Sequence, residues 1–411
     1  MKINKHCFPN GLRLVHYEDT STQMVALNIV YDVGARDEHP EHTGFAHLFE
    51  HLMFGGSAHI PDYDTPLQLA GGENNAWTNN DITNYYLTVP KQNVETAFWL
   101  ESDRMLELAF SEQSLEVQRG VVMEEFKQRC LNQPYGDVGH LFRPLAFRVH
   151  PYCWPTIGKE LSHIEQATLD EVKSFFYRFY APNNAVLAVT GNISWDETVK
   201  LTEKWFAPIP RRDVPVRQLP QEPEQTQERR LTVERNVPLD ALFMGYHMCS
   251  REGADYYAFD ILSDILSNGR SSRLNRRLVQ EQNIFSGIDA YISGTRDAGL
   301  LQISGKPAAG VSLEQAEAAV RKELEELQRS PVDGQELEKV KNKFESTQIF
   351  GNINYLNVAT NLAWFELTGK AEDIDLEVER YRSVTTEQLH TVAQRTFCES
   401  NAVVLYYKSD K

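Results

Sequence analysis

The residues most able to do chemistry in this chain of 411 residues are His47-Leu48-Phe49-Glu50-His51. The two histidines lie four positions apart in an apolar run, so a helix would place both imidazoles on one face, where they could bind a single cation. Glu50 borders that face, and a carboxylate there could take a proton from a water molecule attacking a carbonyl. The order of the residues is the inverse of the H-E-x-x-H arrangement. This pattern predicts a zinc centre with Glu50 beside it.

A catalytic zinc needs a third protein ligand and one open position. Residues 118–126 predict a helix that carries two adjacent carboxylates, Glu124 and Glu125. Neighbouring helical residues point about 100° apart, so only one of the two can share a face with Gln118. A single helical glutamate most often lies on a solvated face, and spacing alone does not distinguish the two.

Together these residues resemble peptidase family M16, the zinc metallopeptidases that include pitrilysin, insulysin and mitochondrial processing peptidase. The resemblance rests on His47–His51 followed by residues 119–125 (Arg-Gly-Val-Val-Met-Glu-Glu). Residues 71–78 (Gly-Gly-Glu-Asn-Asn-Ala-Trp-Thr) are similar to the family's substrate-edge strand, and residues 269–274 resemble a motif of its C-terminal half. The length suits the short, two-domain branch of the family.

The resemblance implies a zinc-dependent endopeptidase that acts on extended peptides. It implies His47, His51 and Glu125 as zinc ligands and Glu50 as the general base. A peptide would add itself as an extra strand beside Asn75, Ala76 and Trp77. Gln118 stands where the family often has a second, supporting glutamate.

One departure from the family bears on activity. Active members commonly carry an arginine, then a tyrosine seven residues later, that hold the substrate and stabilise the oxyanion; here Val279 and Ser286 take those places. Losing one oxyanion donor costs on the order of 10²–10³ in turnover. Arg277 or Tyr291 could substitute only after a change of register. We therefore expect a dimer, either with a sister subunit that supplies the Arg/Tyr pair or with a second copy; the alternative is a non-catalytic subunit for peptide binding or assembly.

The chain contains an internal repeat. Thr168-Leu169-Asp170-Glu171-Val172 and the strand after it align without a gap on residues 217 positions later, beginning at Thr385. At that offset, His47–His51 falls on residues 264–268 (Asp-Ile-Leu-Ser-Asn), so the second copy has lost the metal motif. The sequence thus predicts one zinc ion per chain.

A proline-rich stretch near the middle divides the two copies. We expect an N-terminal domain with the zinc site at 1–208, a linker at 209–228, and a C-terminal domain without the metal motif at 229–411. Strand-like and helical patterns alternate irregularly in each half. They predict an α+β fold of two homologous domains, each a mostly antiparallel sheet with helices packed on one face.

Composition excludes several classes of protein. The net charge of −17 (41 Lys+Arg against 58 Asp+Glu) and the lack of a basic run argue against nucleic-acid binding. No apolar stretch is long enough for a membrane span, and the first residues do not resemble a secretory signal. The five cysteines are scattered and none forms a C-x-x-C pair. These features predict a cytoplasmic protein with reduced thiols.

Overall fold

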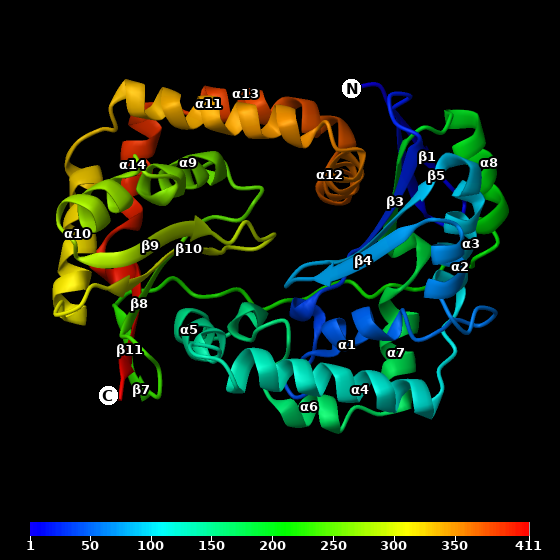
Figure 1. The fold of residues 1–411 in the computed structure, drawn as a ribbon, viewed down its shortest axis with the longest axis horizontal. Coiled ribbons are helices and arrows are strands. Elements are labelled where there is room, and N and C mark those ends of the chain that lie inside the picture. The colour runs from blue at the N-terminus through cyan, green and yellow to red at the C-terminus, as the bar shows by residue number, and fades with distance from the viewer. Residues whose placement is uncertain (411) are drawn as a thin grey trace. The chain divides into compact units, whose positions relative to one another are not determined.

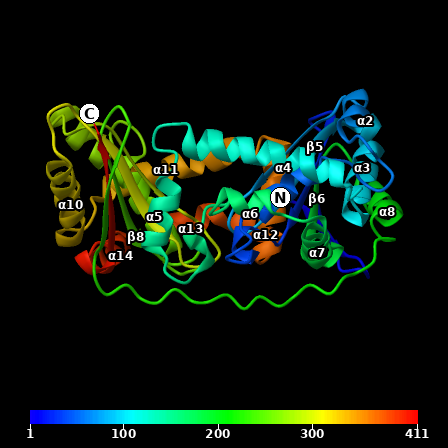
Figure 2. The ribbon, with the colours of Figure 1, turned by 90° about the horizontal axis from the view of Figure 1, so that it is seen from below.

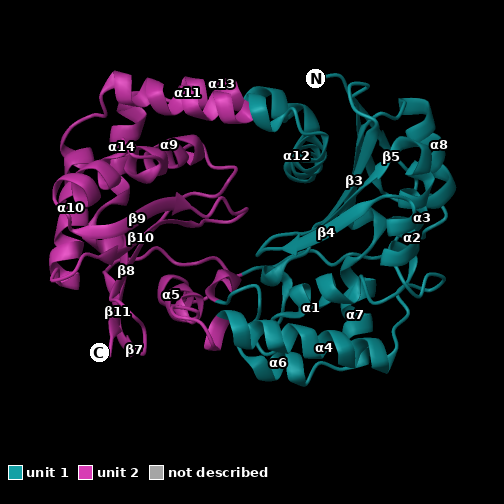
Figure 3. Ribbon diagram, viewed as in Figure 1, with its two compact units in different colours: residues 1–129, 154–219, 349–376 teal, residues 130–153, 220–348, 377–411 magenta. Residues whose placement is uncertain are grey.

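The computed structural model describes residues 1–410, which form two compact units (Figure 3). Unit 1 contains residues 1–129, 154–219 and 349–376. Unit 2 contains residues 130–153, 220–348 and the described chain from residue 377 onward. Two segments, 130–153 and 349–376, thus belong to the unit that is built mainly from the other half of the chain.

Unit 1 is built on a six-stranded sheet with the strand order β1-β2-β6-β3-β5-β4. Neighbouring strands are antiparallel except for the parallel pair of β2 and β6. In that order, the strands are β1 (Ile3–Cys7), β2 (Arg13–Glu18), β6 (Ala185–Gly191), β3 (Met24–Tyr31), β5 (Thr83–Pro90) and β4 (Glu73–Thr78). The helices are α1 (Phe45–Leu52), α2 (Asp64–Leu69), α3 (Val94–Leu106), α4 (Glu112–Phe126), α6 (Leu161–Glu165), α7 (Leu169–Phe179), α8 (Trp195–Trp205) and α12 (Tyr355–Thr368).

Alternation along β3 shows how this sheet buries both of its faces. Leu27 and Ile29 belong to a core formed with α1, α3, α4 and α7. Ala26 and Val30 belong to a second core, formed with α12. Figure 1 shows α12 and α1 on opposite sides of this sheet.

Unit 2 repeats this plan with the strand order β7-β11-β8-β10-β9, in which only β7 and β11 are parallel. One face packs against α9, α10 and α14, and the other against α5. In that order, the strands are β7 (Arg229–Arg235), β11 (Ala402–Ser409), β8 (Ala241–His247), β10 (Leu300–Pro307) and β9 (Phe285–Ile292). The helices are α5 (Val138–Ala146), α9 (Tyr256–Ser267), α10 (Leu313–Arg329), most of α11 (Gly334–Gly351), α13 (Glu377–Ser383) and α14 (Thr386–Thr396).

The two sheets confirm the α+β fold of two homologous halves. The order β2-β6-β3-β5-β4 matches β7-β11-β8-β10-β9 strand for strand, and β1 is an addition. β5 and β10 begin at Thr83 and Leu300, which are 217 positions apart, as are the first residues of α7 and α14. The helix on the second face of each sheet is a difference from the sequence-based expectation of helices on one face. These helices, α5 and α12, also begin 217 positions apart, at Val138 and Tyr355.

The segment at 210–226 has no helix or strand and runs as an extended chain (Figure 2). Its prolines remove backbone donors and disfavour helix. Within residues 1–410, no helix combines the length and apolar character that crossing a bilayer requires.

Replacing Leu362 of α12 with Ala should lower the free energy of unfolding by about 2–5 kcal/mol, because this side chain is fully buried in the core between α12 and the unit 1 sheet. Urea denaturation would measure the change. Leu376→Ala is the matched control, because Leu376 is 42% exposed and should change stability by about 0.5 kcal/mol or less. Equal losses in both variants would contradict the packing of α12 described above.

Candidate metal centre

Helix α1 positions the two histidines. Buried Leu48, Phe49 and Leu52 fix this short helix against the unit 1 core. With its apolar residues held there, His47 and His51 point together on the opposite face, one turn apart. Their ring centroids lie 4.9 Å apart with the planes at 82°. This geometry leaves both Nε2 atoms able to face one point.

Helix α4 brings a carboxylate to that point. The hydroxyl of Ser111 caps this helix by accepting from the Ser114 amide, and buried residues fix it to the same core. Oε2 of Glu125 lies 3.4 Å from Nε2 of His47 and 3.4 Å from Nε2 of His51. Glu124 turns away, is largely exposed, and pairs with Lys127 Nζ at 2.5 Å. The structure therefore distinguishes the two glutamates, which the spacing in the sequence could not do: Glu125 lies beside the histidines and Glu124 does not.

The cluster of His47, His51 and Glu125 fits a zinc ion. Its three donor atoms lie within 4.8 Å of one another. Zinc–ligand bonds of about 2.0–2.1 Å in a tetrahedron place ligand atoms about 3.3–3.4 Å apart, which agrees with the distances to Glu125. Burial lowers the pKa of His47 to about 4, so its imidazole is neutral at pH 7 and keeps a lone pair for a metal. Within residues 1–410, no other group of three His, Cys, Asp or Glu side chains meets in this way.

Glu50 lies on α1 outside this cluster and contacts β4. Burial raises the pKa of its carboxyl, and the hydroxyl of Thr78, which donates to it, opposes that rise. A raised pKa suits a group that must accept a proton near neutral pH. Sequence reasoning missed Thr78. The signal was available, because period-2 alternation places Thr78 on the same face of β4 as Ala76, which packs against the core beneath α1.

Strand β4 carries Asn75, Ala76 and Trp77 at the edge of the sheet, where the strand order pairs it with β5 alone. The amide of Ala76 donates to the side chain of Asn75 at 2.8 Å rather than to β5. The Trp77 side chain is 37% exposed. An edge of this kind can accept another strand.

Two further polar residues lie on or just after α4. Gln118 is half-buried two turns before Glu125, and within the described residues no hydrogen bond joins it to the cluster. Arg129 was missed from the sequence, although it follows Glu125 by four positions; its Nη2 donates to Oε1 of Glu125 at 2.8 Å. The His51 imidazole and this guanidinium both lower the pKa of the Glu125 carboxyl.

In unit 2, the residues that stand in place of the family's arginine and tyrosine make local contacts. Val279 packs against the unit 2 core, and Ser286 of β9 donates to the carbonyl of Lys306 at 3.1 Å. Arg277 forms ion pairs with Glu323 and Glu326 and is therefore already engaged.

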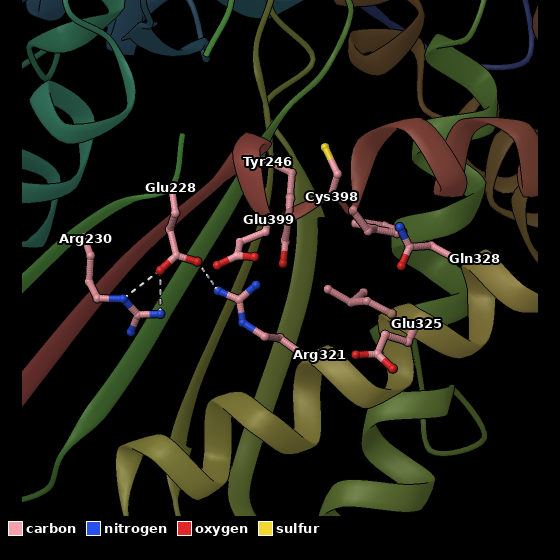
Figure 4. A pocket seen from close by; sticks show the side chains of 10 residues that line it. Glu228, Arg230, Tyr246, Arg321, Glu325, Gln328, Cys398 and Glu399 are labelled. Carbon is pink, nitrogen blue, oxygen red and sulfur yellow. Dashed lines mark hydrogen bonds and ion pairs between the residues drawn. The ribbon is translucent and has the colours of Figure 1, made fainter. Parts of the chain in front are cut away.

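A pocket of about 450 Å³ in unit 2 is distinct from the cluster (Figure 4). Both arginines that line it are engaged, because Glu228 pairs with Arg230 and with Arg321. It contains none of the residues singled out from the sequence.

The chain is similar to known proteins along nearly its whole length. A family model described as Insulinase (Peptidase family M16) matches residues 13–135, which include the whole His/His/Glu cluster. A second, described as Peptidase M16 inactive domain, matches residues 166–344. Zinc protease PqqE of Helicobacter pylori is 26% identical over 405 residues, covering 97% of this chain and 91% of that protein. The uncharacterized zinc protease YmxG of Bacillus subtilis is 25% identical over 406 residues, covering 98% of each.

Solved structures give the same result for the fold. The crystal structure of a protease from Helicobacter pylori matches with a TM-score of 0.94 and 26% identity, covering 99% of each chain. The peptidase M16 inactive domain from Pseudomonas fluorescens matches with a TM-score of 0.90 and 16% identity, covering 100% of this chain and 99% of that one.

Proposed function

This chain belongs to peptidase family M16, and on that basis we propose that it is a zinc-dependent endopeptidase acting on extended peptides. The observation that carries the proposal is the meeting of three donor atoms from α1 and α4 at distances that suit tetrahedral zinc. We assign His47, His51 and Glu125 as the ligands of one zinc ion per chain.

When bound, zinc would supply Lewis-acid chemistry toward the substrate carbonyl and the attacking water. The remaining work falls to residues of the chain. Glu50 takes the proton from that water, and Thr78 orients the Glu50 carboxylate through its hydroxyl. Arg129 holds Oε1 of Glu125, which leaves Oε2 directed at the histidines.

The free edge of β4 supports an extended substrate. A peptide added beside Asn75 and Ala76 would be held by main-chain hydrogen bonds, which suit many sequences. Its alternate side chains would point to opposite faces of the sheet. Trp77 offers an exposed aromatic surface next to that peptide.

We further propose that a partner completes the site, because Val279 and Ser286 stand where the family commonly has arginine and tyrosine. A sister M16 subunit or a second copy of this chain could supply such a pair. A non-catalytic subunit for peptide binding or assembly remains the second candidate function. The absence of the arginine and the tyrosine favours it.

Zinc content and peptide cleavage by the purified chain test these proposals. We expect one zinc ion per chain and slow cleavage of a quenched-fluorescent peptide library, lost on chelation and restored by zinc. If the missing pair limits the rate, the double variant V279R with S286Y should raise kcat by about 10²-fold. A chain that binds zinc but cleaves nothing, even as the double variant, would favour the non-catalytic subunit. A chain that binds no zinc would refute the proposal that this protein is a zinc-dependent endopeptidase.

A further inference from the structure

Helix α1 carries both histidines but has no cap from its own sequence. Its N-cap residue is Gly44, with φ of 86°, and no side chain there accepts a hydrogen bond. A Cβ at Gly44 would lie 2.6 Å from Cδ1 of Ile164 and 2.9 Å from the carbonyl oxygen of Ile157. The usual capping residues Ser, Thr, Asp and Asn are therefore excluded from this position. The amides of the first turn must find acceptors elsewhere.

The side-chain carboxyl group of Glu38 provides them. Its Oε2 accepts from the Gly44 amide at 2.9 Å, and its Oε1 accepts from the Ala46 amide at 2.8 Å. The Glu38 side chain is buried, with 7% exposure. Both oxygens are thus used on the turn that leads directly into His47.

The loop that bears Glu38 is itself held in place. Arg217 donates from Nε to Asp37 at 2.5 Å and from Nη1 to Asp32 at 2.8 Å. The indole of Trp154 donates to the carbonyl of Ala35 at 2.9 Å. Arg217 comes from the proline-rich linker, so the linker makes specific contacts with the loop before α1.

We propose that Glu38 is a positioning residue for the zinc centre, with Arg217 of the linker fixing the loop from which it acts. An isolated helix of eight residues is marginal, so its first turn depends on such contacts. If that turn frays, His47 moves relative to His51 and Glu125, and the three donor atoms no longer converge. This inference rests on the proposed zinc function, but it concerns a residue outside the ligand set.

The test measures zinc affinity, by competition with a chromogenic chelator, beside the Tm of each zinc-free protein. E38A should weaken zinc binding by about 10–100-fold, the range expected for partners that orient ligands. E38Q should have a smaller effect, because its carbonyl oxygen can still accept one of the two amides. R217Q should weaken binding less than E38A. The absorption spectrum of the cobalt-substituted protein should change in E38A, because it reports the arrangement of the ligands.

Ser194→Ala is the matched control. Ser194 caps α8, which carries no site residue, by accepting from the Glu197 amide. This variant should lower Tm while its zinc affinity and cobalt spectrum stay at the wild-type values.

Zinc affinity of E38A within twofold of wild type, with an unchanged cobalt spectrum, would overturn the inference and leave the proposed function intact. If E38A does not fold, the same two measurements are made on E38Q. Wild-type zinc affinity and a wild-type cobalt spectrum in E38Q would then overturn the inference. A wild-type chain that binds no zinc would overturn the proposed function instead, and this inference with it.

Discussion

Replacing Glu50 with Gln should reduce kcat by about 10²–10⁴-fold, the contribution of a positioned general base, while one zinc ion stays bound. The amide has nearly the shape of the carboxylate but cannot accept the proton. Because Glu50 lies outside the group of three donor atoms, its loss should leave their geometry unchanged. Turnover of a fluorogenic peptide and zinc content, measured on the same preparation, would check both parts of this result.

Thr78→Val is the informative companion to that variant. It removes the hydroxyl that donates to Glu50 but keeps the size of the side chain. We expect a smaller fall in kcat, with zinc retained. If Glu50→Gln loses its zinc, Glu50 belongs to the ligand set, and its assignment as the base is wrong.

Glu125→Gln should weaken zinc binding by more than about 100-fold, since the loss of a ligand should exceed the 10–100-fold effect of partners that only orient ligands. The neighbouring residue offers a closely matched control. Glu124→Gln removes the same charge one position earlier on α4, but Glu124 is largely exposed and pairs only at the surface with Lys127. It should bind zinc as the wild type does.

Chelator competition on the two variants would measure this difference. If both variants bind zinc with the affinity of the wild type, Glu125 is not a ligand, despite its position 3.4 Å from both histidines. Loss of zinc in Glu124→Gln alone would reverse the assignment of the two glutamates.

The sequence predicted the parts of the site that depend on local periodicity. The spacing of His47 and His51 brings them together wherever the segment is helical, and the apolar run around them predicts a helix. The choice between Glu124 and Glu125 came from family resemblance, because the face that α4 turns toward α1 depends on packing between helices. The fold class followed from the mixed patterns and the repeat.

Contacts that follow no local sequence pattern were beyond sequence reasoning. Glu38 reaches α1 from a loop six residues before its N-cap, and no capping pattern has that spacing. The helices on the second faces were missed for a related reason. An amphipathic pattern shows that α12 has an apolar side, but it does not say which sheet that side covers.

The reciprocal placement of α5 and α12 means that neither repeat can cover its own sheet. A half-length polypeptide ending before residue 209 would leave one face of its sheet bare, with Ala26 and Val30 in water. It could bury that face by exchanging helices with a second molecule, so that α5 of each molecule packs against the sheet of the other. Joining two copies end to end turns such a concentration-dependent exchange into an intramolecular one. The repeat is thus a unit of sequence but not a unit of folding.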